Sequence, residues 1–258
     1  MASWTAEAPG VVERLLKENA PEVRSLARFL SRRNPALVLA AARGRGGLAA
    51  LYAKHLLEAR LLWPVLPLAL PLFALYGARP KAPFPSLLLA YDLAGEGAGA
   101  EELVRAYRGE GALTLAFVGR EESPLAGAAE AVLPLHLGGA EGAGFLAGLA
   151  ATAQLAAHLL EEPRLREALP ALPEAMARAL EGEEGLEVGE GLFVLGPGFA
   201  YPVALEAALR LKEAGLRAEG VAALEELFPA GLPLLVLVGR DGVLAGLIPA
   251  LEGLKARG

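Results

Sequence analysis

The stretch LFVLGPGFAYPVALEAALRLKE (192–213) decides the fold, because it joins three features in one order. A short apolar run, LFVL, leads into the turn GPG, and a run with Ala and Leu at helical spacing follows. Gly215 comes just after that run and can close the helix. A strand that passes through a glycine turn into a helix is the repeating unit of a parallel α/β sheet.

The first half of the chain repeats this unit. ALVLAAARGRGG (36–47) precedes a helical pattern over 48–62, and SLLLAYDL (86–93) precedes another over 99–108. Strands are also predicted at 64–76, 113–119 and 131–137, with helices at 10–31, 123–129 and 141–160. Apolar runs this continuous suit strands that are covered on both faces. The sequence therefore predicts an α/β fold with a doubly wound parallel sheet and helices on both sides.

The domain organisation follows from where the pattern pauses. Residues 161–191 are charged, Pro-punctuated and mostly helical, and the strand–helix pattern restarts after them. We expect a first domain over 1–165, including N-terminal helices, a helical linker over 166–190, and a shortened second domain over 191–258. The apolar stretch 61–77 contains three prolines and is too short to span a bilayer comfortably, so we expect no membrane partner.

Composition excludes several function classes. The chain has no Cys and three widely spaced His residues, so we expect neither a metal site nor a cofactor. Its net charge of −6 and the absence of a basic cluster argue against nucleic-acid binding. The N-terminus lacks the basic start and apolar core of a signal peptide, which predicts a cytoplasmic protein. Abundant Arg, Ala, Leu, Glu and Pro suggest a thermophilic source.

The segment GPGFAYPVALEAALRLKE (196–213) resembles the glycine-turn-plus-helix segment of the sugar isomerase (SIS) family. That family includes the isomerase half of glucosamine-6-phosphate synthase and the glucosamine-6-phosphate deaminases. Four more segments match in the same order, at 50–58, 114–135, 152–160 and 218–227. The resemblance implies tandem flavodoxin-like three-layer domains, a sugar or sugar-phosphate ligand, and a homodimer. Relatives continue beyond the residue that aligns with Gly258.

The resemblance implies a ligand site at two loops, although the residues there differ from the family pattern. The family's phosphate loop, Ser-x-Ser-Gly-x-Ser/Thr, falls on AYDLAGEG (90–97), where only the glycine remains. A Thr-Lys pair of the family falls on Gly148 and Leu149. The ligand-binding positions implied in the first domain are Arg43, Gly44, Arg45, Asp92, Gly95, Glu96 and Gly97.

The lost hydroxyls predict weaker phosphate binding. A carboxylate about 5 Å from a phosphate charge costs roughly 3 kcal/mol per charge pair at an effective dielectric near 20. Asp92 can instead act as a helix N-cap, and Glu96 as an acid favoured by the helix N-terminus. Arg43 and Arg45 either bind an anion from the neighbouring strand end or pair with Asp92 and Glu96 in a local charge cluster.

In the second half, the resemblance implies that Glu213 is the general base for 1,2-proton transfer and that Glu225 contacts the ligand. The family's ring-opening histidine falls on Phe228. Two hypotheses follow. Either the chain binds a carbohydrate derivative with weakened or lost catalysis, or it is an active aldose–ketose sugar-phosphate isomerase or glucosamine-6-phosphate deaminase that uses Glu213.

Overall fold

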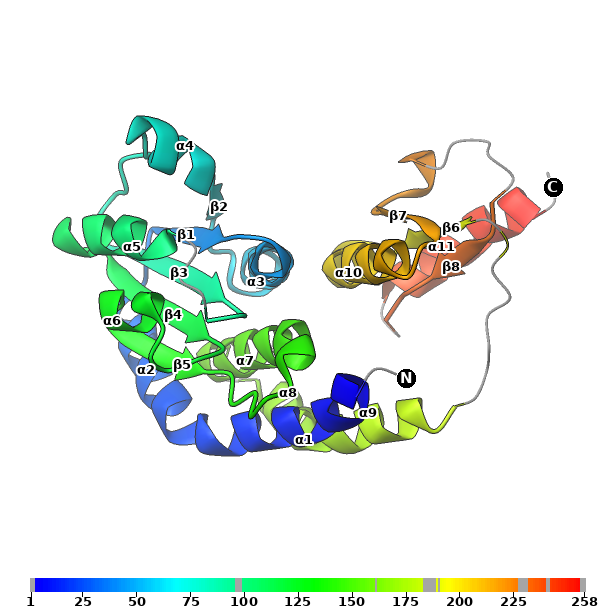
Figure 1. The fold of residues 1–258 in the computed structure, drawn as a ribbon, viewed down its shortest axis with the longest axis horizontal. Coiled ribbons are helices and arrows are strands. Elements are labelled where there is room, and N and C mark those ends of the chain that lie inside the picture. The colour runs from blue at the N-terminus through cyan, green and yellow to red at the C-terminus, as the bar shows by residue number, and fades with distance from the viewer. Residues whose placement is uncertain are drawn as a thin grey trace. The chain divides into compact units, whose positions relative to one another are not determined.

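The computed structural model describes residues 3–95, 99–160, 162–182, 189, 191–226, 232–239 and 242–255 (Figure 1). The chain forms two compact units, Met1–Glu184 and Gly185–Gly258, which we call unit 1 and unit 2. Each unit is built on its own parallel sheet.

Unit 1 contains a five-stranded sheet in the order β2-β1-β3-β4-β5, and every neighbouring pair is parallel. Its strands are β1 (Leu37–Ala42), β2 (Val65–Leu68), β3 (Ser86–Asp92), β4 (Leu113–Val118) and β5 (Ala131–Pro134). Its helices are α1 (Ser3–Glu18), α2 (Ala20–Arg33), α3 (Arg45–Leu61), α4 (Leu70–Tyr76), α5 (Ala100–Gly109), α6 (Pro124–Ala128), α7 (Gly144–Leu159), α8 (Pro163–Ala168) and α9 (Leu172–Leu180).

The helices cover both faces of this sheet (Figure 1). Helices α5 and α6 pack on one face, and α3 packs on the other together with α7 and α2. Because the central strand β3 is covered on both sides, all seven of its residues are buried. A doubly wound sheet thus explains why SLLLAYD is apolar nearly throughout.

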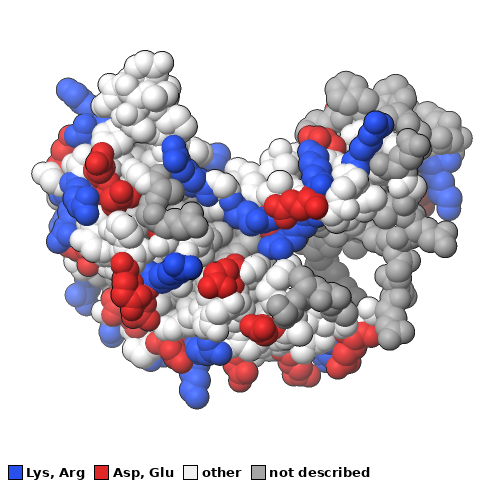
Figure 2. Space-filling view, viewed as in Figure 1, with Lys and Arg blue, Asp and Glu red and all other residues white. Residues whose placement is uncertain are grey.

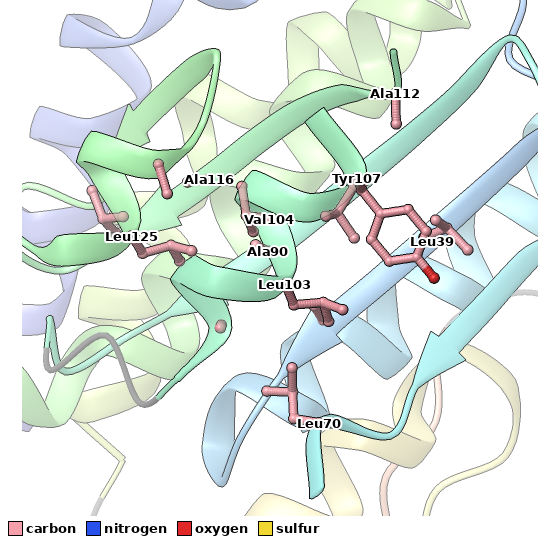
Figure 3. Packing of buried hydrophobic residues seen from close by; sticks show 14 residues of the cluster. Leu39, Leu70, Ala90, Leu103, Val104, Tyr107, Ala112, Ala116 and Leu125 are labelled. Atoms are coloured by element: carbon pink, nitrogen blue, oxygen red, sulfur yellow. The ribbon is translucent and has the colours of Figure 1, made fainter. Parts of the chain in front are cut away.

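Part of the core lies between α5, α6 and the sheet (Figure 3). Leu103, Val104 and Tyr107 of α5 are all 1% exposed or less, and they pack in one cluster with Leu39 of β1 and Leu125 of α6. The Tyr107 hydroxyl donates to the carbonyl of Pro80 at 2.7 Å. The polar end of this buried side chain therefore has a hydrogen-bond partner at the edge of the core.

Unit 2 contains a three-stranded parallel sheet in the order β7-β6-β8. Its elements are β6 (Gly191–Leu195), α10 (Tyr201–Glu213), β7 (Arg217–Val221), β8 (Leu234–Val236) and α11 (Gly242–Lys255). Ala204 and Ala208 of α10 pack on one face of β6, while Leu247 and Leu251 of α11 pack on the other. The predicted α/β fold with doubly wound parallel sheets is confirmed.

Three local expectations differ from the structure. Residues 64–76, expected as one strand, form β2 and then α4, because Pro71 stands in the first turn of a helix, where proline is tolerated. Strand β7 was not foreseen, since Glu219 and two glycines interrupt any apolar pattern around it. Within the expected linker, α9 packs against α1 of unit 1.

One helical stretch of the described residues, Glu141–Leu159, is long and apolar enough to cross a membrane by length and composition. However, 72% of its most apolar window is buried inside the protein, where α7 contacts α1, α2 and α3. Burial of this kind is expected of a core helix.

The first prediction concerns this core. Leu103→Ala removes a side chain that is 1% exposed, so we expect unit 1 to lose about 2–5 kcal/mol of unfolding free energy. Both tryptophans, Trp4 and Trp63, lie in unit 1, so their fluorescence in a urea titration reports on that unit. Arg105→Ala, at an exposed position of the same helix, should change stability by less than about 0.5 kcal/mol. Equal losses in both variants would contradict the described packing.

Candidate functional site

The strand order of unit 1 places a topological switch point between β1 and β3. In an open parallel sheet, the chain leaves these two strands in opposite directions, and the crevice at their carboxyl ends is where ligands bind. The residues that follow β1 are Arg43–Arg45, and the residues that end and follow β3 are Asp92–Gly95. The structure therefore brings the candidate residues of the first domain to one edge. Glu96 and Gly97 lie outside the described residues.

The turn after β1 depends on glycine. Gly44 is the N-cap of α3 and has φ of +54°, a backbone conformation that L side chains rarely adopt. A Cβ on Gly46 would stand 3.1 Å from the carbonyl oxygen of Tyr91, so α3 begins very close to β3. Arg43 is exposed and Arg45 is half-buried, so the two side chains lie at the rim of the switch point.

The carboxylate of Asp92 points toward the turn that follows it and bonds to that turn's backbone. Its Oδ1 accepts a hydrogen bond from the amide of Gly95 at 2.9 Å, and the residue is 7% exposed. The expected N-cap role is wrong, because α5 begins at Ala100 and its N-cap is Gly99. Asp92 thus engages a backbone N–H at the position where the family pattern has a phosphate loop.

The first residues after β3 are held by close backbone contacts. The amide of Gly119 donates to the carbonyl of Asp92 at 2.9 Å, and a Cβ on Gly119 would stand 2.3 Å from the carbonyl oxygen of Leu93. The side chain of Leu93 reaches α7, where its Cδ2 would lie 3.1 Å from a Cβ on Gly148. Leu93 therefore packs against Gly148, the position that matches the family's threonine in the resemblance, and leaves little room there for a larger side chain.

Arg120 is a candidate that the sequence reasoning missed. It follows β4, and its aliphatic stem lies over Gly95: a Cβ on Gly95 would stand 2.5 Å from Arg120 Cγ. Among the described residues, neither Arg43 nor Arg120 has a carboxylate partner. Since β3 lies between β1 and β4, these two arginines flank the Asp92–Gly95 turn. The sequence feature that could have identified Arg120 is its position directly after the predicted strand 113–119.

A polar cleft of about 290 Å³ opens beside this turn, at the carboxyl ends of β4 and β5. Its lining contains one guanidinium and three carboxylates, contributed by Arg120, Glu121, Glu122 and Glu141. Ala94 connects the cleft to the β3 loop. Carboxylates can accept hydrogen bonds from sugar hydroxyls, and a guanidinium can donate two parallel bonds to an anion.

His136 also lines the cleft, but both nitrogens of its ring contact residues at the end of α1 and just after it. Its Nε2 lies 2.9 Å from Oδ1 of Asn19, and its Nδ1 lies 3.1 Å from a carboxylate oxygen of Glu18. Asn19 is itself fixed, because its Nδ2 donates to the carbonyl of Pro134 at 2.8 Å. With both ring nitrogens engaged, His136 tethers the end of α1 to the end of β5.

Tyr91 is another buried polar group near the switch point. Its hydroxyl lies 2.9 Å from Thr152 Oγ1, which in turn donates to the carbonyl of Gly148 at 2.8 Å. Burial raises the pKa of Tyr91 above its ordinary value. The hydroxyl is therefore held neutral inside unit 1 and joins β3 to α7.

In unit 2, the two candidate glutamates lie at opposite ends of the sheet. Glu213 is the last residue of α10, which runs from the carboxyl end of β6 back to the start of β7. Glu225 follows β7 and lies in the 3-10 turn Leu224–Glu226. Both are exposed, and unit 2 by itself does not bring them together. Phe228 lies outside the described residues.

Comparison with solved structures identifies the family. The crystal structure of a proposed phosphosugar isomerase from Silicibacter pomeroyi DSS-3 matches with a TM-score of 0.91 and 30% sequence identity, covering 98% of this chain and 82% of that one. The chain belongs to the sugar isomerase (SIS) domain family. No protein-family profile matches the chain.

Other relatives agree with membership of the SIS family. Glutamine–fructose-6-phosphate aminotransferase (isomerizing) of Corynebacterium efficiens is 30% identical over 67% of this chain and 33% of its own length. The chain spans a third or less of the length of the curated relatives it matches. The C-terminal domain of the glucosamine–fructose-6-phosphate aminotransferase of Francisella tularensis shares the fold, with a TM-score of 0.73, 17% identity, and coverage of 98% and 79%.

The second prediction concerns the Asp92–Gly95 turn. Asp92→Ala leaves the Gly95 amide without its side-chain acceptor, so we expect a loss of about 1–3 kcal/mol in the urea unfolding free energy of unit 1. Asp92→Asn keeps an acceptor oxygen and should lose less than about 1 kcal/mol. If the asparagine variant were as unstable as the alanine variant, the charge of Asp92 rather than its hydrogen bond would hold the turn.

Proposed function

We propose that this SIS-family protein binds a carbohydrate derivative of the sugar-phosphate type at the carboxyl edge of the unit 1 sheet, with weakened or lost catalysis. The observation that carries the proposal is the pair Arg43 and Arg120 on either side of the Asp92–Gly95 turn, both without a carboxylate partner among the described residues. Ligands of open parallel sheets bind at this edge.

The binding mode follows from the chemistry of the edge. The loop offers no hydroxyl, and the amide of Gly95 already donates to Asp92. The ligand's anionic group would therefore be bound by guanidinium groups, chiefly Arg120, whose planar donors suit phosphate or carboxylate oxygens. The sugar would lie in the 290 Å³ cleft, where carboxylates such as Glu121 and Glu141 accept hydrogen bonds from its hydroxyls.

The same features support weakened catalysis. Isomerisation requires a base at C1–C2 and an acid–base group at the ring oxygen. His136 has both ring nitrogens engaged, and the family's histidine position is Phe228. The alternative, an active isomerase or deaminase, rests on Glu213, which stands at the family's general-base position and is exposed to solvent. The cytoplasmic location, the homodimer and the absence of nucleic-acid and membrane partners remain predictions.

The third prediction tests binding. Glucosamine 6-phosphate or fructose 6-phosphate should raise the melting temperature in a concentration-dependent way, because a ligand that binds only the folded state stabilises it by mass action. The unphosphorylated sugars should bind more weakly. Arg120→Ala removes a charged donor and should weaken calorimetric binding by about tenfold or more. Arg105→Ala is the matched control and should bind as the wild type does. No stabilisation by either phosphosugar at millimolar concentration would contradict the proposal.

The fourth prediction separates the two hypotheses. We expect the wild type to isomerise phosphosugars or release ammonia no faster than the Glu213→Gln variant, because Phe228 stands at the family's ring-opening histidine position. The measurement is product formation from each phosphosugar under saturating conditions. A clear wild-type rate that disappears in Glu213→Gln, with binding retained, would favour the active enzyme and overturn the claim of lost catalysis.

A further inference from the structure

Another cavity of unit 1, of about 380 Å³, lies among helices α1, α3, α7 and α9. We call it the helical cavity; Thr5, Tyr52, Leu149 and Met176 are lining residues from its four helices. The helices contact one another, α1 with α7 and α9, and α3 with α7 (Figure 1). The helical cavity shares no lining residue with the polar cleft, and no residue of the turns after β1 and β3 lines it.

The lining of the helical cavity follows from the sequence pattern of its helices. In each of α1, α7 and α9, the residues that line it recur every three or four positions, which places them on one face of the helix. In α9 they include Leu172, Met176 and Leu180, all half-buried. The unbranched thioether side chain of Met176 can adapt to the shape of a bound molecule.

The helical cavity is uncharged. The described residues that line it include no Lys, Arg, His, Asp or Glu, whereas charged side chains are spread over the face of unit 1 that Figure 2 shows. A ligand that enters the cavity loses its water, and an ionised group that loses its water without a partner carries a large cost in free energy. The cavity therefore suits an uncharged molecule and disfavours a sugar phosphate.

The hydroxyl of Tyr52 is a polar group in this apolar lining. The hydroxyls of two other tyrosines of unit 1, Tyr91 and Tyr107, have hydrogen-bond partners at 2.9 and 2.7 Å. Within the part of the chain that the structure describes, the Tyr52 hydroxyl makes no hydrogen bond. Burial raises the pKa of Tyr52 above its ordinary value, so the hydroxyl is neutral at neutral pH. It can donate to a ligand oxygen or accept from a ligand hydroxyl.

We infer that the helical cavity binds an uncharged, largely apolar small molecule that carries one hydroxyl or carbonyl group, with Tyr52 as its hydrogen-bond partner. Ligand cavities are mostly apolar and contain a few polar groups that orient the ligand. Since an apolar cavity of about 150 Å³ holds benzene, one of about 380 Å³ has room for a molecule of about two or three rings, or a chain of similar bulk. The inference goes beyond the proposed sugar-phosphate site and does not depend on it.

The test titrates the full chain with N-phenyl-1-naphthylamine, an uncharged aromatic probe whose fluorescence rises when it leaves water. The rise should saturate as expected for a single site. 1-Decanol should displace the probe, and decanoate at neutral pH should do so at least about tenfold less effectively, because the cavity offers its carboxylate no cation. Equal displacement by both compounds would overturn the assignment to an uncharged ligand.

Two variants locate the probe. Ala153 is a half-buried lining residue of α7, and Ala153→Phe should fill part of the cavity and weaken probe binding by about tenfold or more. Ala177→Phe is the matched control, since Ala177 is exposed on α9 and does not line the cavity, and it should bind the probe as the wild type does. Urea unfolding followed by tryptophan fluorescence checks that both variants fold.

Tyr52→Phe tests the hydrogen bond and keeps the ring in place, so it remains informative if Ala153→Phe is unstable. It should weaken the binding of 1-decanol by about three- to tenfold, because one hydrogen bond is lost. It should change the binding of the probe by less than about twofold, because the probe is held by apolar contacts. A wild type without saturable probe binding, a folded Ala153→Phe that binds the probe unchanged, or a Tyr52→Phe that binds 1-decanol unchanged would each overturn the inference.

Discussion

The turn Asp92–Gly95 after β3, which packs against β4 and α7, is the constraint on which the proposed site depends. The carbonyl oxygen of Leu93 leaves no room for a Cβ on Gly119, and the Leu93 side chain packs against Gly148. With its main chain fixed in this way, the loop directs the Asp92 carboxylate back to the Gly95 amide. The family's arrangement, in which loop hydroxyls and amides face a phosphate, is replaced by a turn that satisfies its own donor internally. Under the proposed function, an anion at this edge is bound chiefly by side chains that follow the neighbouring strands, such as Arg120.

Much of the fold could be predicted from the sequence, because the strands of unit 1 are buried on both faces and therefore read as continuous apolar runs. β3, with all seven residues buried, is the clearest case. Strand β7 and residues 64–76 were harder to predict, because neither shows a continuous apolar run of one structural type. Strand β7 alternates exposed Arg217 and Glu219 with buried Ala218 and Gly220. Because its buried positions are mostly small residues, it gives only a weak apolar signal. The stretch 64–76 was misread because proline breaks a helix interior yet is accepted in its first turn, where α4 places Pro71.

The candidate site was only partly accessible to sequence reasoning. Arg43–Arg45 and Asp92–Gly95 could be placed together, because they follow strands that a doubly wound sheet brings side by side at a switch point. The inward turn of Asp92 could not, since it depends on where α5 begins, and sequence patterns locate helix starts only approximately. Arg120 was missed because its place over Gly95 results from tertiary packing between two loops.

We propose that guanidinium groups, and not the turn after β3, hold the ligand's anionic group. The most direct measurement is a crystal structure of the protein with fructose 6-phosphate. We expect phosphate oxygens within hydrogen-bond distance of the Arg120 guanidinium, with Asp92 Oδ1 still accepting from the Gly95 amide. A phosphate bound by the Gly95 amide, with the Asp92 carboxylate turned out to solvent, would contradict it.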